Sequence, residues 1–197
     1  LELADEADAI SMRYFSERPE TFTKDDGTLV TRADREIEAA LRDRIVRRYP
    51  AHVILGEEGG VSGSQGGREP RSRDGAGSGP GFRWVIDPID GTNNFAWGIP
   101  IFATLIALQL DGAPEVGVVS APALRERYDA ARGEGARCNG QPIHVSGVSS
   151  LTESRFVFAT WEEWVDAGLD PHVDERQVGA GVDGHRLGWE LLVGVVD

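Results

Sequence analysis

The chain has 197 residues, of which 40% are hydrophobic, and this is enough to form a substantial buried core rather than a disordered segment. Its 33 acidic and 20 basic side chains give a net charge of −13, which argues against nucleic acid or anionic lipid as a partner because both attract cationic surfaces. No stretch approaches the roughly 20 apolar residues of a membrane span, and the single Cys138 cannot form an internal disulfide. We therefore expect a soluble, cytoplasmic protein that gathers cations.

Two amphipathic helices are predicted in the first 50 residues. Between residues 1 and 15, apolar side chains recur at intervals of three or four, which is the spacing of one helical face. The second helix begins with Thr31 as a capping residue, keeps an apolar residue at every fourth position, and ends near residues 49–50. This interpretation places Asp34 in the first turn of the second helix.

A short apolar run at residues 53–55 predicts a buried strand, which Gly56 ends and which delivers Glu57 and Glu58 at its C-terminal end. Residues 59–81 follow with nine Gly and four Ser but no aromatic residue, Leu or Ile, so little apolar surface is available to order them. We expect a mobile loop there. The apolar pattern resumes at residues 82–86 as a strand that runs into Asp87, so the loop is interpreted as a lid within one domain.

Further strands are predicted at residues 101–110 and 116–119, and the turn residues between them indicate an antiparallel pair. Another strand is expected at residues 128–132. Toward the C-terminus the pattern weakens, with a strand expected at 155–159 and a helix at 161–168. The mixture of helices and strands predicts a layered α/β sandwich of the α+β class.

The run DPIDGT at residues 87–92 joins the second predicted strand to the start of a helix, so the carboxylates of Asp87 and Asp90 converge near its first turn. Mg²⁺ prefers oxygen ligands and usually keeps water and substrate phosphate in its coordination shell, which such a pair permits. The amides of Gly91 and Thr92 can point at an anion, helped by the positive end of the helix dipole. An acidic turn is usually only a turn, but here a second acidic cluster stands at another strand end. Metal and phosphate are therefore expected to meet at one turn.

Three acidic signatures follow one another along the first half of the chain. They are K-x-D-x-T-x-V-T-x-A-D at residues 24–34, GEE at residues 56–58, and WVIDPIDGTNNF at residues 84–95. With these signatures in this order, the chain resembles the inositol monophosphatase superfamily. A later stretch at residues 133–146 is similar to the hairpin of that superfamily, so the resemblance extends over residues 1 to about 160.

The resemblance implies a Mg²⁺-dependent phosphomonoesterase and a role for each acidic residue. The residues that would bind Mg²⁺ are Glu57, Asp87, Asp90 and Ile89, the last through its main-chain carbonyl. Thr92 would hydrogen-bond the attacking water, and either Glu57 or the Asp34 and Thr92 pair would help to remove its proton. Asp90, Gly91 and Thr92 would also hold the substrate phosphate.

Several residues around these motifs have two interpretations. Without the resemblance, Asp34 would be an ordinary acid at a helix N-terminus, and Lys24 would be a solvated charge on a loop. Glu58 is expected to support the metal ligands rather than to join them. Trp84 and Trp97 are expected to be core aromatic residues beside the site, and Trp97 is also a candidate for contact with the substrate. The four histidines lack the close spacing of a metal-binding pair, which argues against a zinc site.

The alcohol half of the substrate would be held outside these motifs, so the phosphate chemistry does not identify it. The runs at residues 100–108 and 117–124 look most like the actinobacterial histidinol-phosphate phosphatases. This resemblance favours L-histidinol phosphate over myo-inositol 1-phosphate as the small phosphorylated metabolite, and leaves other sugar phosphates and nucleotide 3′-phosphates open. It also leads us to expect a homodimer.

The family's second segment, in which a Trp-Asp pair supplies a further metal ligand, has no clear counterpart, since Trp189 is followed by Glu190. Residues 1–160 are therefore interpreted as the metal- and phosphate-binding phosphatase domain. Residues 161–197 are interpreted as a partial or divergent start of the second layer of the same fold, which would be incomplete at its C-terminal end. A non-catalytic remnant that still binds Mg²⁺ or phosphate is the alternative hypothesis.

Overall fold

The structure, a computed structural model, describes residues 1–17, 20–24, 29–63 and 81–150. The chain divides into one compact unit, Leu1–Ile143, and a second unit, His144–Asp197, of which residues 144–150 are described. All the helices and strands that the structure describes belong to the first unit. The strand and helix predicted beyond residue 150 lie outside the described residues.

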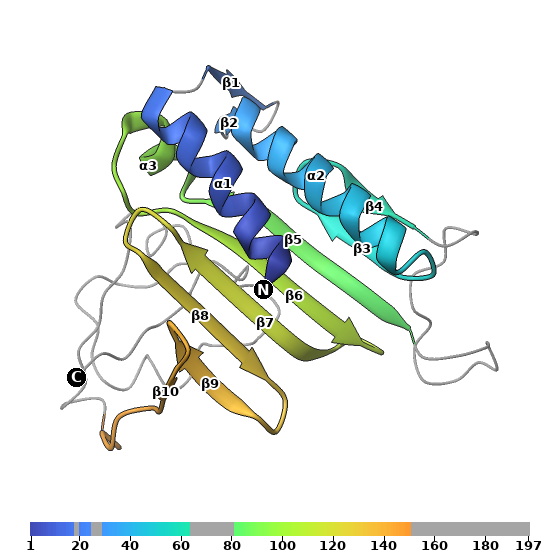
Figure 1. Cartoon of the computed structure of the whole chain (residues 1–197), viewed down its shortest axis with the longest axis vertical. Coiled ribbons are helices and arrows are strands. Elements are labelled where there is room, and N and C mark those ends of the chain that lie inside the picture. Colours follow the sequence, from blue (N-terminus) through green and yellow to red (C-terminus); the bar gives the residue numbers. More distant parts are fainter. Residues whose placement is uncertain (18–19, 25–28, 64–80, 151–197) are drawn as a thin grey trace. The chain divides into compact units, whose positions relative to one another are not determined.

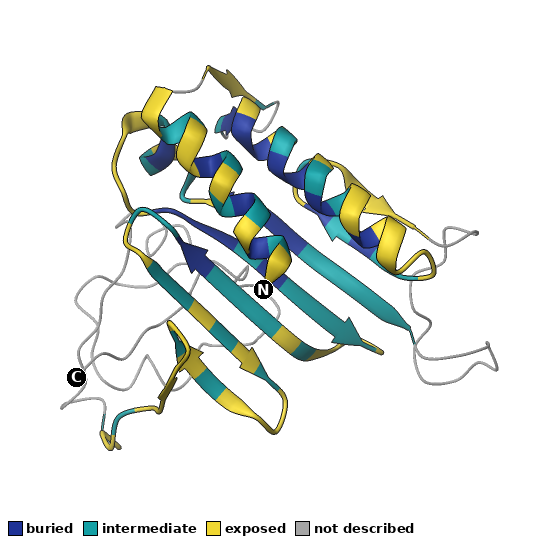
Figure 2. Cartoon of the chain, in the orientation of Figure 1, coloured by how far each residue is buried: buried dark blue, intermediate teal, exposed yellow. Residues whose placement is uncertain are grey.

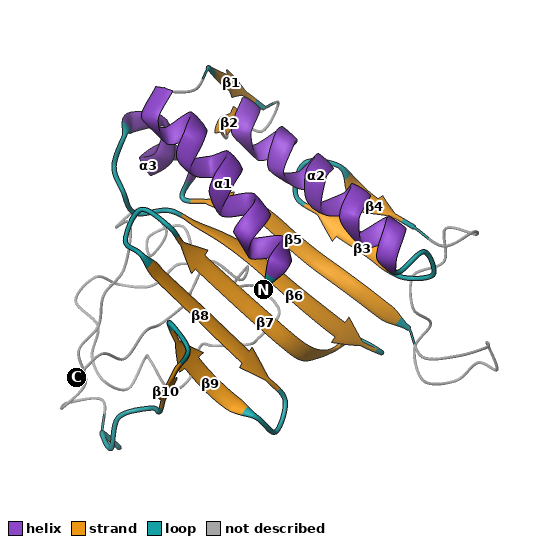
Figure 3. Cartoon of the chain, viewed as in Figure 1, coloured by secondary structure: helices purple, strands orange, loops and turns teal. Residues whose placement is uncertain are grey.

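The helices of the first unit are α1 (Glu2–Glu17), α2 (Arg32–Arg48) and α3 (Thr92–Trp97) (Figure 3). The first two confirm the predicted amphipathic helices. Thr31 caps α2 as expected, because its hydroxyl accepts the Ala33 N–H while the Asp34 carboxylate accepts the Thr31 N–H. None of the helices in the described part of the chain is both long and apolar enough to cross a membrane.

Eight strands form one sheet in the order β10-β9-β8-β7-β6-β5-β3-β4 (Figure 1). Their bounds are β3 (Val53–Gly56), β4 (Gly60–Ser62), β5 (Phe82–Asp90), β6 (Ala103–Leu110), β7 (Ala113–Ala121), β8 (Glu126–Ala131), β9 (Gly135–Cys138) and β10 (Gln141–Ile143). Two further strands, β1 (Thr21–Thr23) and β2 (Leu29–Thr31), pair with each other. Within the eight-stranded sheet, β3 and β5 run parallel and the other neighbours run antiparallel. The predicted α+β class is confirmed.

The hairpin between β6 and β7 turns at Asp111 and Gly112, where the sequence predicts a turn. Both residues have positive φ angles, 50° and 83°, which suit the tight turns that follow the twist of an antiparallel pair. Ala113 and Pro114 were expected in this turn, but they already belong to β7 and pair with Leu110 and Gln109. The hairpin is therefore tighter than the sequence indicates.

Strand β4 lies within the stretch that the sequence predicts as a loop. All three residues of Gly60–Ser62 are exposed, and they pair antiparallel with residues 54–56. Pairing with β3, rather than burial of its own side chains, orders this segment, which explains why its composition gave no strand signal. Residues 64–80 of the predicted loop lie outside the described residues.

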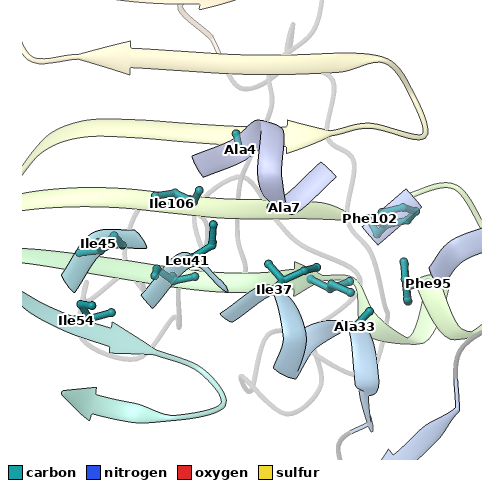
Figure 4. Packing of buried hydrophobic residues seen from close by; sticks show 12 residues of the cluster. Ala4, Ala7, Ala33, Ile37, Leu41, Ile45, Ile54, Phe95, Phe102 and Ile106 are labelled. Carbon is teal, nitrogen blue, oxygen red and sulfur yellow. The ribbon is translucent and has the colours of Figure 1, made fainter. Parts of the chain in front are cut away.

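The core lies between the sheet and the two long helices, which cover the same face of the sheet within the first unit (Figure 1). Helix α2 packs on β5, and α1 packs on β6 and β7. Their buried residues are dark blue in Figure 2, and Figure 4 shows Leu41 and Ile45 of α2 close to Ile54 of β3, with Ile37 farther along the helix. Complete burial of each such side chain contributes about 1.5–3 kcal/mol, so this layer anchors α2 firmly to the strands that carry the acidic segments.

The two tryptophans that were expected in the core differ in how far they are buried. Trp84 packs against the hydrophobic cluster as predicted, whereas Trp97 is 70% exposed, which corrects the prediction. The reason is the short length of α3, in which Phe95 is the buried residue. A position two residues later is rotated by about 200° around a helix axis, so Trp97 faces away from the core.

Candidate functional site

Parallel pairing of β3 with β5 brings two acidic segments to the same edge of the sheet. Gly56, the last residue of β3, pairs with Ile86 of β5, so Glu57 and Asp87 come next in the two segments. The Glu57 N–H donates a 3.2 Å hydrogen bond to the Ile86 carbonyl and extends the ladder by one step. The structure therefore brings the GEE and DPIDGT segments together through strand pairing.

Asp87 is a buried carboxyl group at this edge. It is 4% exposed, and its Oδ1 atom has no hydrogen-bond partner among the described residues. Burial, followed by the negative charges of Glu57 and Asp90, raises the pKa of Asp87 to about 8. A cation beside this carboxylate would oppose both effects, because it neutralises charge and supplies the missing partner.

Asp34 reaches the same edge from α2, and its two carboxylate oxygens make different contacts. Its Oδ2 accepts hydrogen bonds from the Thr31 N–H at 2.8 Å and from the Thr31 hydroxyl at 2.6 Å. Its Oδ1 lies 3.5 Å from the Thr92 hydroxyl, which donates a 2.9 Å hydrogen bond to the Ile89 carbonyl. Burial raises the pKa of Asp34 to about 6, against the effect of its hydrogen bonds to Thr31. Asp34 therefore caps the helix through Oδ2, while its Oδ1 is the oxygen that faces the proposed site.

The turn from β5 into α3 depends on Gly91. This residue adopts a left-handed conformation with φ of 81°, and a Cβ atom there would lie 3.0 Å from the Ile101 carbonyl oxygen. The pairing of β5 with β6 also shifts in register between Asp87 and Asp90. The chain can thus turn sharply enough for Thr92, the first residue of α3, to lie beside Asp34.

Lys24 contributes the positive charge that faces this acidic edge. Its Nζ lies 2.8 Å from Glu57 Oε1 and 2.6 Å from Glu58 Oε1. Burial lowers the pKa of Lys24, but the two carboxylates outweigh burial and raise it above its ordinary value. The sequence left the role of Lys24 open, and the structure makes it a counter-ion of the GEE segment.

The donor set fits a hard cation by its chemistry, although it is not a preformed cage. Carboxylate and carbonyl oxygens are the ligands that Mg²⁺ prefers, and the unpartnered Oδ1 of Asp87 is such a donor. Across the described ranges, no three Asp, Glu, His or Cys side chains adopt a ready metal-binding arrangement. Glu57 is instead paired with Lys24. The individual ligand assignments therefore stay predictions.

Two residues that the sequence did not indicate as part of the site contact the backbone of the GEE segment. Glu38 and Arg42 of α2 form an ion pair at 2.7 Å and contact the backbone that follows Glu57. Their spacing of four residues is visible in the sequence, but ion pairs with this spacing are common on exposed helix faces and do not indicate a site. The signal that sets this pair apart is burial, since Glu38 is 2% exposed, and burial requires the tertiary structure.

Comparison with known sequences identifies relatives over most of the chain. The sequence model of the inositol monophosphatase family matches residues 1–174. A histidinol-phosphatase of Chlorobaculum parvum is 39% identical over 183 residues, which cover 92% of this chain and 65% of the relative. A histidinol-phosphatase of Mycobacterium tuberculosis is 42% identical over 175 residues, with 86% and 62% covered. The chain thus spans somewhat less than two thirds of the length of these curated relatives.

Solved structures of the same kind share the fold. An inositol monophosphatase from Anabaena is 35% identical, with a TM-score of 0.61 over 78% of this chain and 50% of that one. The Thermotoga maritima IMPase is 32% identical, with a TM-score of 0.65 over 78% and 54% of the two chains. The likeness covers about half of each solved chain.

Proposed function

Because the chain belongs to the inositol monophosphatase family, we propose that it is a Mg²⁺-dependent phosphate monoester hydrolase that acts on a small phosphorylated metabolite. The observation that carries this proposal is the buried Asp87, whose Oδ1 lacks a partner among the described residues and whose pKa is raised by burial and by Glu57 and Asp90. Such an arrangement is unfavourable without a cation and becomes favourable with one.

Each acidic residue has a role in this proposal. The residues that would hold Mg²⁺ are Glu57, Asp87, Asp90 and the carbonyl of Ile89. When bound there, the metal would supply Lewis-acid activation of water and would neutralise charge on the phosphate. Lys24 competes with the metal for Glu57, because its Nζ contacts Glu57 Oε1 and leaves Oε2 as the oxygen that the metal would bind first.

The remaining roles belong to the turn into α3. Thr92 would orient the attacking water. The proton of this water would pass to Asp34 through the Thr92 hydroxyl, or directly to Glu57. The 3.5 Å separation of Thr92 from Asp34 supports the first route. Asp90, Gly91 and Thr92 would hold the substrate phosphate, since the first amides of a helix have no acceptor within the helix.

We favour L-histidinol phosphate as the substrate. The curated relatives named histidinol-phosphatase support this choice. Inositol 1-phosphate is the second candidate, because an inositol-1-monophosphatase of Synechocystis is 41% identical over 131 residues. The single Cys138 agrees with a reducing cytoplasmic setting, and we keep the homodimer as a proposal that light scattering can test.

Phosphate release from the two substrates, with and without Mg²⁺, tests the proposed function. We expect metal-dependent turnover, faster with L-histidinol phosphate, and its loss in the Asp90→Asn variant with an unchanged circular dichroism spectrum. A folded sample that releases no phosphate from either substrate would favour the non-catalytic remnant. Full activity of Asp90→Asn would contradict the assigned ligand set.

A further inference from the structure

The turn between β3 and β4 rests directly on a buried carboxylate of α2. The Glu38 side chain accepts the Glu58 N–H on Oε2 at 2.7 Å and the Gly59 N–H on Oε1 at 2.8 Å. Arg42 donates to the same Oε1 at 2.7 Å and also contacts the Gly60 carbonyl. One helix therefore binds both donors and acceptors of this turn.

The turn leaves no room beside Glu38. A Cβ atom on Gly56 would lie 2.4 Å from the carboxylate carbon of Glu38, and one on Gly59 would lie 2.8 Å from its Oε1. Both distances are well inside van der Waals contact. A methyl group at either of the two glycines that flank Glu57 and Glu58 would therefore have to displace the Glu38 carboxylate from its present position.

Glu57 is consequently held from two sides. Its own N–H donates to the Ile86 carbonyl of β5, while the next two N–H groups donate to Glu38 of α2. Its side chain emerges between these anchors toward Asp87, whose pKa responds to its charge. Asp34 lies one helical turn before Glu38 on α2, so the same helix orients both Asp34 and the backbone of Glu57.

A buried carboxylate is a costly way to order a turn. Its removal from water is unfavourable unless hydrogen bonds and a paired charge compensate for it, and here two backbone N–H groups and Arg42 are committed to that compensation. In addition, Glu38 adds negative charge near a segment that is already acidic, and Arg42 offsets it. A polar uncharged residue would order an ordinary turn at lower cost.

We propose that Glu38, braced by Arg42, is a positioning residue that fixes Glu57 for divalent-cation binding without touching the cation itself. This inference rests on the proposed function, since it takes Glu57 as a metal ligand. Loss of the Glu38 carboxylate leaves every predicted ligand in place but frees the backbone of the GEE turn. Divalent affinity then falls although no donor has been removed.

The test is the binding of Mn²⁺ alone, followed by electron paramagnetic resonance of the free ion and by calorimetry, in the full chain. Glu38→Gln keeps the size of the side chain but offers one acceptor oxygen in place of two. We expect the Kd for Mn²⁺ to rise by about 10- to 100-fold, the usual effect of losing a residue that orients a ligand.

The matched control is Glu36→Gln on the same helix. Glu36 also accepts two side-chain hydrogen bonds, from Arg13 and Tyr14, but it contacts no part of the GEE turn. This variant is expected to bind Mn²⁺ like the unaltered chain. Equal weakening in both variants would mean that α2 acts only through general stability, and would overturn the positioning role.

A double-mutant cycle isolates the route through Glu57. In a Glu57→Gln background, Glu38→Gln is expected to cause no further loss of Mn²⁺ affinity, whereas independent effects would multiply. Gly59→Ala, which pushes a methyl group against the Glu38 carboxylate, gives a second route if Glu38→Gln does not fold, and is expected to weaken binding in the same direction.

The outcomes separate this inference from the proposed function. If the unaltered chain binds no Mn²⁺, the metal site itself is wrong, and the positioning role is wrong with it. If the unaltered chain binds Mn²⁺ and both Glu38→Gln and Gly59→Ala bind it equally well, the metal site stands and the positioning role alone is overturned.

Discussion

At one end of the β3–β5 strand pair, aromatic rings stack around a histidine, whereas at the other end carboxylates crowd together. His52, just before β3, stacks on Tyr49 and Phe82 with ring centroids 4.8 and 4.7 Å apart. Its Nδ1 accepts a 3.0 Å hydrogen bond from Trp84. This end satisfies its polar atoms and buries apolar surface, which are the ordinary sources of stability.

The acidic end does the opposite. Asp87 is buried with an oxygen that has no hydrogen-bond partner in the described part of the chain, and Lys24 forms ion pairs with Glu57 and Glu58. The same two strands thus have one end where packing and hydrogen bonds stabilise the fold, and another end where buried and neighbouring carboxyl groups destabilise it. Groups held in this way are typical of functional sites, because a bound cation would offset both the burial and the mutual repulsion of the carboxylates.

Removal of the buried Asp87 carboxyl group is expected to have the largest effect. We predict that Asp87→Asn lowers phosphate release by about 100-fold or more, yet raises the free energy of unfolding of the metal-free protein by roughly 1–3 kcal/mol, because the folded protein no longer has to hold a carboxyl group whose pKa is raised by burial and by Glu57 and Asp90. Chemical denaturation and phosphate assays measure the two quantities. Loss of both stability and activity would show that Asp87 is a structural residue.

Truncation of a side chain at the aromatic end is expected to lower stability without affecting metal binding. Trp84→Ala is expected to lower the free energy of unfolding by about 2–3 kcal/mol, since it removes a large ring from the packed cluster. Mn²⁺ affinity of the folded variant should stay unchanged. A matching loss of Mn²⁺ affinity would show that the two ends of the strand pair are coupled.

Lys24 offers a smaller test at the acidic end. Lys24→Met removes the cation that competes for Glu57, so Mg²⁺ is expected to bind about two- to fivefold more tightly, while the metal-free protein melts at a lower temperature. Arg13→Met, which breaks the ion pair with Glu36 elsewhere on α2, serves as the control. Weaker Mg²⁺ binding by Lys24→Met would place Lys24 in the metal-loaded site.

The smallest effect concerns pH at the aromatic end. Burial lowers the pKa of His52, so below its ordinary value near 6.5 the unfolded chain binds more protons there than the folded chain. Stability contributed by His52 is therefore lost as the pH falls from 7.5 to 5.5. The difference in melting temperature between the unaltered chain and His52→Gln should shrink over this range. A constant difference would contradict the shift.

Much of the fold follows from local patterns. The capping Thr31, the helical spacing of α2 and the apolar strand before Gly56 each predict an element that the structure contains. Trp97 and β4 were missed, since the exposure of one and the pairing of the other depend on distant parts of the chain. Periodicity reports which face of an element is apolar, not what that face meets.

The sequence by itself determined the family, the α+β class and the position of the GEE and DPIDGT segments at strand ends, because each rests on short motifs beside recognisable strands. Tertiary structure alone decided that Asp34 shares its oxygens between Thr31 and Thr92, that Lys24 pairs with Glu57, and that Glu38 supports the GEE turn. The physical reason is distance along the chain. The contacts of Asp34 with Thr92, Lys24 with Glu57 and Glu38 with the GEE turn join residues 20 or more positions apart. They exist only after β3 has paired with β5 and α2 has packed on β5.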